Sequence, residues 1–191
     1  TIFLSDGSGV GWTRMTLPVG DAPSALVVLD FDGDGDNDLV TANKDADTSS
    51  TLSFLTNDGT GSFTRSDLEA AVRASSISSA DLDGDGDKDV VFLSEDGVGL
   101  LYNIGGGVFG DPVLLGLPVA WGVELADLNG DGAMDLAVAN RVLGARLSIF
   151  LSLGDGTFET PVHFEFDTDL RAISAGDADD DGDVDVLVAA D

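Results

Sequence analysis

Cysteine is absent from this chain of 191 residues, so disulfide bonds cannot stabilise it. Its eight lysine and arginine residues form no basic stripe of the kind that binds nucleic acid. No apolar run approaches the roughly 18 residues of a membrane span. No glycine-rich phosphate loop leads into a helix, and the single histidine, His163, has no obvious nucleophile beside it. We therefore expect neither nucleic-acid binding, nor a membrane span, nor enzymatic activity.

Acidic residues are abundant, and their distribution is uneven. The chain has 36 of them and a formal net charge of −28. Nineteen lie in four short segments, residues 30–38, 81–89, 127–135 and 177–185, which leaves 17 acids against seven bases elsewhere. A halophilic protein would instead spread its acids over the whole surface. The excess charge therefore marks four particular loops.

The four segments are copies of one loop. Their first aspartates lie 51, 46 and 50 residues apart, a period typical of propeller and solenoid repeats. Side-chain oxygens occupy positions 1, 3, 5 and 9, a glycine at position 6 allows the sharp turn, and position 7 is expected to offer its backbone carbonyl. The expected metal ligands are Asp30, Asp32, Asp34, Asp36, Asp38, Asp81, Asp83, Asp85, Asp87, Asp89, Asp127, Asn129, Asp131, Ala133, Asp135, Asp177, Asp179, Asp181, Asp183 and Asp185.

Many oxygen ligands, most of them carboxylates, favour calcium over magnesium. The first six positions match the beginning of an EF-hand loop, but position 12 is Thr41, Phe92, Val138 or Val188 instead of glutamate. These strand-forming residues indicate calcium loops between β-strands, and we predict one Ca²⁺ in each loop. The alternative is that the Asp-Gly runs are only solvated turns, which four copies with the same ligand positions make improbable. The third loop should bind more weakly because it has Asn129, and the fourth should carry backbone strain at Asp180.

Short apolar segments recur around each loop and indicate four strands per repeat. A strand of small and apolar residues precedes the loop, as in residues 25–29, and a more apolar one follows it, as in 39–42. A third strand, such as 52–55, leads through a glycine-rich turn to a fourth. The fourth strands open with the aromatic residues Trp12, Phe63, Phe109 and Phe158. No helical periodicity is present, so the pattern predicts propeller blades, with the aromatics packed between neighbours.

The ends of the chain suggest how the blades close. Residues 1–12 match the third and fourth strands of a repeat, and residues 186–190 match a second strand. Together they could complete one blade and leave no exposed sheet edge. We therefore expect a single all-β domain over residues 1–191, a β-propeller of four antiparallel blades closed by N- and C-terminal half-blades. The alternative is a four-repeat part of a seven-bladed propeller.

At these motifs the chain resembles the FG-GAP and VCBS repeat family, found in integrin α-subunit heads and in bacterial surface proteins. The resemblance rests on the aspartate loops with their following strands and on turns such as Leu153 to Phe158. It covers essentially the whole chain and implies propeller blades with calcium between the first and second strands. Members of the family are mostly adhesive or sugar-binding modules, although some polysaccharide lyases use the fold.

Scarce positive charge is expected on the face opposite the calcium loops. We place Lys44, Arg146 and Trp121 there, and we predict ligand contacts by Trp121, Arg171, Arg73 and Arg141. Tryptophan can stack on a sugar ring, and arginine can bind a carboxylate through two nitrogens. The alternative is that Trp121 plugs the central channel and that the arginines pair with neighbouring acids.

These observations predict a calcium-stabilised, secreted or cell-surface binding or adhesion module. The start at Thr1, without a methionine or a leader, fits a processed secreted protein or an excised domain. The expected partner is a glycan or an extracellular protein. A structural, self-associating scaffold is the alternative, and a carbohydrate-active enzyme is less favoured.

Overall fold

The computed structural model describes residues 1–44, 51–69, 74–117, 120–140 and 145–191. Within these ranges the chain forms sixteen β-strands and no helix. It therefore has, in its described part, no helix that could cross a membrane.

Three four-stranded antiparallel sheets form the middle of the molecule, and in each the strands pair in chain order. Sheet 1 contains β3 (Pro23–Leu29), β4 (Asp38–Asn43), β5 (Thr51–Asn57) and β6 (Phe63–Glu69). Sheet 2 contains β7 (Ser76–Ala80), β8 (Asp89–Ser94), β9 (Gly97–Leu101) and β10 (Val113–Leu114). Sheet 3 contains β11 (Ala120–Ala126), β12 (Asp135–Asn140), β13 (Ala145–Phe150) and β14 (Val162–Phe166). The predicted four-stranded repeat is confirmed in all three sheets.

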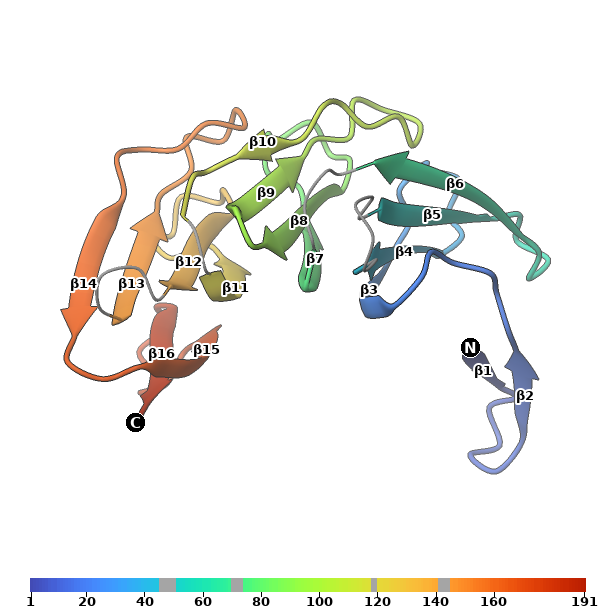
Figure 1. Ribbon diagram of the computed structural model, residues 1–191, viewed down its shortest axis with the longest axis horizontal. Coiled ribbons are helices and arrows are strands. Elements are labelled where there is room, and N and C mark those ends of the chain that lie inside the picture. The colour runs from blue at the N-terminus through green and yellow to red at the C-terminus, as the bar shows by residue number, and fades with distance from the viewer. Residues whose placement is uncertain (45–50, 70–73, 118–119, 141–144) are drawn as a thin grey trace.

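A two-stranded sheet lies at each end. The N-terminal half-sheet pairs β1 (Ile2–Ser5) with β2 (Trp12–Met15), and the C-terminal half-sheet pairs β15 (Leu170–Gly176) with β16 (Asp185–Ala190). Figure 1 shows the five sheets following one another along an open arc with the two termini at its ends. Among the described residues no strand pairing joins β1 to β16. The structure thus does not show the predicted four-bladed closed ring, because the way each sheet packs on the next leaves the half-sheets apart.

The core consists of three apolar layers, one between each pair of adjacent sheets from sheet 1 to the C-terminal half-sheet. The second strand β4 is mostly buried, and β8 and β12 are buried along their whole length because a neighbouring sheet covers each of their faces. This double burial explains their continuous apolar sequence, which differs from the alternation of a half-exposed strand.

Two of the four aromatic residues expected to open the fourth strands pack between neighbouring sheets as predicted. These two, Phe109 and Phe158, lie ahead of β10 and β14 and form isolated bridges with Asn103 and Ser152. The ring of Phe109 lies 4.6 Å from that of Phe54 and 5.9 Å from that of Phe31, in the layer between sheets 1 and 2. The ring of Phe158 lies 6.3 Å from that of Phe150, in the next layer. Trp12, in contrast, is 58% exposed, and neither Trp12 nor Phe63 belongs to the three apolar layers.

Candidate functional site

Each aspartate loop joins the first strand of its sheet to the second, and its first aspartate organises the turn. Asp30 Oδ1 accepts a 2.8 Å hydrogen bond from the Gly33 amide, and its Oδ2 accepts a 3.0 Å bond from the Gly35 amide. Asp81 and Asp127 make the same pair of bonds. Gly33 and Gly35 have φ angles of 77° and 95°, in the left-handed region where a Cβ is disfavoured. These hydrogen bonds and glycine conformations therefore define the conformation of the loop backbone.

The aspartate at position 9 has a further role that the sequence did not reveal. In sheet 2, Asp89 Oδ2 accepts a 2.8 Å bond from the Leu82 amide, and Oδ1 accepts a 2.8 Å bond from the Asn103 amide. Asp38 and Asp135 make equivalent pairs of bonds in sheets 1 and 3. All three carboxylates are buried. Position 9 thus ties the start of the loop to the end of the third strand.

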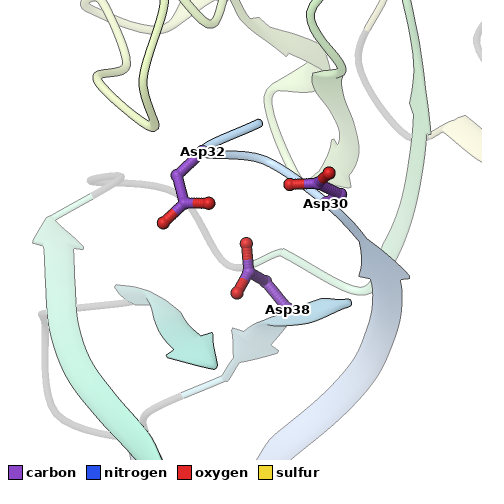
Figure 2. A group of neighbouring side chains, drawn as sticks. All are labelled: Asp30, Asp32 and Asp38. Atoms are coloured by element: carbon purple, nitrogen blue, oxygen red, sulfur yellow. The ribbon is translucent and has the colours of Figure 1, made fainter. Parts of the chain in front are cut away.

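Carboxylates converge in three of the loops. Figure 2 shows the side chains of Asp30, Asp32 and Asp38 turned toward one another, and one oxygen from each lies within 4.8 Å of the others. Carboxylate oxygens of Asp81, Asp83 and Asp85 come equally close to one another in the second loop. Those of Asp177, Asp179 and Asp185 do so in the fourth. Two oxygens on opposite sides of a calcium ion, each about 2.4 Å away, would be separated by about 4.8 Å. The convergence therefore fits the spacing of a calcium shell, and an all-oxygen donor set fits a hard cation.

The third and fourth loops depart from the common pattern in the two places noted in the sequence. In the third loop, Asn129 Nδ2 donates a 2.8 Å bond to Asp131 Oδ2, so an amide takes the place of one acidic ligand. In the fourth loop, Asp180 has a φ angle of 64° at the position where Gly33, Gly84 and Gly130 stand in the other copies. The predicted backbone strain at Asp180 is therefore confirmed.

Side chains at position 7 stand outside the three acidic groups. In the first three loops they lie near the turn between the third and fourth strands. The nearest atom to a Cβ built on Gly59 is Asp36 Oδ2, and a Cβ on Gly154 would lie 3.8 Å from the Cβ of Ala133. For the second loop, a Cβ on Gly105 would lie 3.7 Å from Asp87 Oδ2. This arrangement is consistent with a position whose side chain does not bind the ion. Asp36, Asp87, Ala133 and Asp183 stay predicted as ligands through their carbonyl oxygens alone.

Burial disfavours the ionised form of two position-9 carboxylates, Asp38 and Asp89. Burial raises the pKa of Asp89 to about 6, against the opposing hydrogen bonds from the Asn103 and Leu82 amides, and the charges of Asp83 and Asp85 raise it further. Burial likewise raises the pKa of Asp38. A divalent cation would relieve this repulsion, because it favours the ionised form of every carboxylate around it.

At the opposite ends of the strands, sheet 1, sheet 3 and the C-terminal half-sheet share a local irregularity. The β11–β12 register shifts between Ala120 and Gly122, which leaves Trp121 on a bulge. Ser24 in sheet 1 and Arg171 in the C-terminal half-sheet occupy equivalent bulges. A bulge changes the direction in which a side chain points. Trp121 and Arg171, both predicted as ligand contacts, therefore occupy equivalent, exposed positions on the face away from the acidic loops.

A groove of about 700 Å³ opens on this face, across the ends of sheets 1, 2 and 3. Its lining residues are Lys44, Ser75, Ser76, Ser94, Glu95, Ala120 and Trp121. Trp121 is 53% exposed, so much of its ring is open to solvent. The groove combines an aromatic surface with hydroxyl groups and charges of both signs. Ser94 ends β8 and Glu95 lies in the β8–β9 turn, and no sequence pattern distinguished that turn as part of a site.

Only part of the predicted ligand set gathers at the groove. Trp121 lines it, whereas Arg171 is paired with Asp191, with Nε 2.8 Å from the carboxylate oxygen. Arg146 pairs with Glu165 at 2.7 Å. The alternative role of an arginine as a partner of neighbouring acids therefore applies to these two residues. Arg73 and Arg141 lie outside the described residues.

The single histidine belongs to a structural network. His163 Nδ1 lies 2.9 Å from Ser148 Oγ, which accepts a 2.9 Å bond from Asn140 Nδ2. In sheet 1, Asn43, Ser53 and Asp67 form the equivalent chain, with aspartate in place of histidine. Ser148 is completely buried and cannot meet a substrate in this structure. The recurrence indicates that the network joins three strands of a sheet.

Known structures resemble this fold along most of the chain. An Agrocybe aegerita lectin that recognises non-reducing terminal N-acetylglucosamine is 24% identical, with a TM-score of 0.55 over 84% of this chain. The V. cholerae biofilm matrix protein Bap1 is 22% identical, with a TM-score of 0.55 over 88%. BBS1N, solved in complex with ARL6DN, is 14% identical, with a TM-score of 0.59 over 93%. At these identities the likeness shows a propeller-like fold and no more.

The chain spans 45% of the lectin, 28% of Bap1 and 52% of BBS1N, which is less than two thirds of each. No curated protein matches the sequence. The sequence profile of the FG-GAP-like repeat matches three overlapping segments, residues 30–92, 81–138 and 127–188. Each segment runs from one aspartate loop through the next loop and the strand after it. From these matches, which cover most of its length, we conclude that the chain belongs to the FG-GAP-like repeat family.

Proposed function

We propose that this protein is a calcium-stabilised extracellular module that binds a glycan in the groove beside Trp121. The observation that carries the proposal is the exposed tryptophan on a β-bulge, at the edge of a polar groove and on the face away from the acidic loops. Sugars combine an apolar ring face with a rim of hydroxyl groups. The groove offers matching groups, an indole for stacking and serine, lysine and glutamate side chains for hydrogen bonds.

Calcium has a supporting role in this proposal. One ion in each of the four aspartate loops would offset about eight of the negative charges, at two charges per ion. Metal bound to the folded loops and absent from the unfolded chain would stabilise the scaffold by mass action. Calcium bound on the opposite face would then make the sheets that carry the ligand-binding face more rigid.

An extracellular location follows from the same chemistry. Loops of this type bind calcium at the concentrations found outside cells, which exceed those of most cytosols. The similarity to a fungal lectin and to a biofilm matrix protein favours the same setting. We propose binding without catalysis, because the clustered carboxylates belong to the loops and His163 belongs to a hydrogen-bond network that joins three strands of sheet 3.

The test is a glycan-array screen of the calcium-loaded protein and of two variants. Trp121→Ala should lose every specific signal, because it removes the stacking surface. Arg171→Ala is the matched control, since it changes the equivalent bulge of the next repeat but lies outside the groove. A blank array, or binding that survives Trp121→Ala, would overturn the glycan assignment and favour a protein ligand.

A further inference from the structure

Asn103 contacts two aspartate loops at once. It lies two residues after β9 of sheet 2 and is completely buried. Its backbone amide donates a 2.8 Å hydrogen bond to Asp89 Oδ1, in the second loop. Its side-chain amide donates a 2.7 Å bond to the Phe31 carbonyl oxygen, in the first loop, and a longer bond of 3.4 Å to the Lys88 carbonyl oxygen, in the second. One buried residue therefore joins two loops that lie 51 residues apart in the sequence.

The two carbonyl groups that Asn103 holds each stand just before a predicted metal ligand. Phe31 precedes Asp32 in the first loop, and Lys88 precedes Asp89 in the second. A peptide group is planar, so a hydrogen bond that fixes its orientation also limits the direction in which the next side chain leaves the backbone. Asn103 therefore acts on the placement of one predicted ligand in each loop.

The turn that begins at Asn103, residues 103–109, packs directly on the first loop. A Cβ on Gly107 would lie 3.1 Å from the Cβ of Asp32, so the backbone of the turn approaches that loop closely. Asn103 Oδ1 accepts a 3.2 Å bond from the Gly105 amide, within the same turn. The side chain of Asn103 thus holds the turn through its acceptor and the two loops through its donors.

Burial makes these contacts costly to break. A buried amide that loses its acceptor cannot bond to water instead, so the loss is not compensated. If either loop changes its conformation, the Asn103 side chain must lose a partner or the turn must move as well. Because the turn also contacts the other loop, the conformation of each loop favours the matching conformation of the other.

The interface between sheets 2 and 3 is built differently. Ser152 occupies the position of Asn103, and its backbone amide likewise donates to a position-9 carboxylate, that of Asp135. Its hydroxyl oxygen accepts a 3.1 Å bond from the Gly154 amide in its own turn. Within the described ranges, this shorter side chain makes no bond to the second loop. The two interfaces therefore differ in whether one side chain bonds two loops.

We propose that Asn103 is a positioning residue for the first and second loops together, so that calcium bound at one loop raises the affinity of the other. The proposal rests on the calcium binding that is part of the proposed function. Once either loop has its metal-bound conformation, Asn103 holds the other loop close to the conformation that binds calcium. By thermodynamic linkage the effect is mutual, whichever loop binds first. The first and second loops thus act as a pair, whereas the third binds independently of the second.

The first experiment measures this coupling with Asn103 in place. Changes at ligand position 5 weaken individual loops, so that chosen loops are left to bind: Asp34→Ala, Asp85→Ala, Asp131→Ala and Asp181→Ala. Isothermal titration calorimetry gives the association constant of each loop alone and the overall constant of two loops together. The coupling factor is the overall constant divided by the product of the two single-loop constants. We expect a factor of about five or more for the first and second loops, and no coupling between the second and third.

The outcomes separate this proposal from the proposed function. Independent binding by the first and second loops would overturn the proposal and leave the calcium assignment intact. An equal factor for the second and third loops would also overturn it, because Ser152 lacks the amide. A chain that binds no calcium would overturn the calcium assignment as well. The titrations contain no glycan, so the result does not depend on the glycan assignment.

The second experiment repeats the titrations with Asn103→Ser, which introduces the residue that sheet 3 has at this position. The coupling factor should be lost. Asn57→Ser is the matched control, because the Asn57 amide at the same position of sheet 1 donates to the Asn37 carbonyl oxygen of its own loop. This control should keep the factor.

The coupling factor also distinguishes positioning from a purely structural role. General loosening of the fold would lower the single-loop constants without removing the factor. A factor that survives Asn103→Ser, or that is lost equally in Asn57→Ser, would refute the role of Asn103. The first experiment does not use these variants, so it tests the proposal even if Asn103→Ser fails to fold.

Discussion

Tyr102 and Gly156 join two neighbouring sheets through one hydrogen bond: the phenolic oxygen of Tyr102 lies 2.6 Å from the Gly156 carbonyl oxygen, to which it donates. Tyr102 directly follows β9, and Gly156 lies in the β13–β14 turn of the next sheet. The bond is partly buried, and burial raises the pKa of Tyr102 to about 12, with the charges of Asp89, Asp83 and Asp155 adding to the shift. The phenol therefore remains a neutral donor at physiological pH.

Removing this hydroxyl group should weaken the contact between sheets 2 and 3. We expect Tyr102→Phe to lower the free energy of unfolding by about 1 kcal/mol, because the Gly156 carbonyl loses its donor while the ring stays in place. Urea denaturation in the presence of calcium measures the change. The control is Val108→Ala, at an exposed position between β9 and β10. It should change the free energy of unfolding by less than about 0.5 kcal/mol. Equal effects of the two changes would show that the hydroxyl makes no specific contribution.

Chelation of calcium should destabilise the fold strongly. A site filled at 100 times its dissociation constant adds about 2.7 kcal/mol, so the loss of several sites should lower the melting temperature by on the order of 10 °C or more. Scanning calorimetry with excess chelator, compared with millimolar calcium, measures the difference. Magnesium at the same concentration should restore little of the loss, since it is reluctant to shed its waters. A melting temperature unaffected by chelator would contradict the metal assignment.

Ligand positions in the third loop can be separated by two substitutions. Asp131→Ala removes a position-5 carboxylate and should weaken calcium binding at this loop by tenfold or more, which corresponds to at least about 1.4 kcal/mol. Ala133→Ser changes a side chain that faces the β13–β14 turn and should leave the affinity nearly unchanged. Isothermal titration calorimetry of both variants provides the comparison. Equal losses would show that the numbering of the loop is wrong.

Backbone strain in the fourth loop should be relieved by glycine. Asp180 has a φ angle of 64°, so we expect Asp180→Gly to stabilise the protein by about 0.5–1 kcal/mol. The reverse change in the third loop, Gly130→Asp, should destabilise it by a similar amount, because Gly130 has a φ angle of 75°. Denaturant unfolding in calcium tests the pair. Shifts of the same sign in both variants would argue against backbone strain as the cause.

The local features of this fold could be predicted from the sequence because short-range rules determine them. Alternating aspartates and glycines specify the loops, and the apolar runs beside them specify the strands. The burial of Phe109 and Phe158 followed from their regular spacing. The path of the arc could not be predicted in this way, because a small change in the packing angle at every interface adds up along the chain. The predicted closure of the ring depends on this path, and the described strands do not show it.

In the candidate sites too, some features follow from the spacing of residues within one loop, and others depend on distant parts of the chain. The convergence of Asp30, Asp32 and Asp38 follows from spacing within one loop. The second bond of each position-9 aspartate depends on an amide from a distant strand and leaves no local pattern. The bulge at Trp121 was equally hidden. Arg171, also predicted as a ligand contact, pairs with Asp191 and does not line the groove, whereas its contact with a ligand stays a prediction.

The contacts of Asn103 show what would be lost if the chain were cut between two sheets. Its side-chain amide donates a 2.7 Å bond to the Phe31 carbonyl oxygen in the loop of sheet 1 and a 3.4 Å bond to the Lys88 carbonyl oxygen in the loop of sheet 2. A cut between β6 and β7 would therefore separate a buried amide from one of its two acceptors, even though every sheet would remain whole. Dividing the chain between two sheets therefore disrupts contacts that belong to both of them, even where no strand pairing is cut.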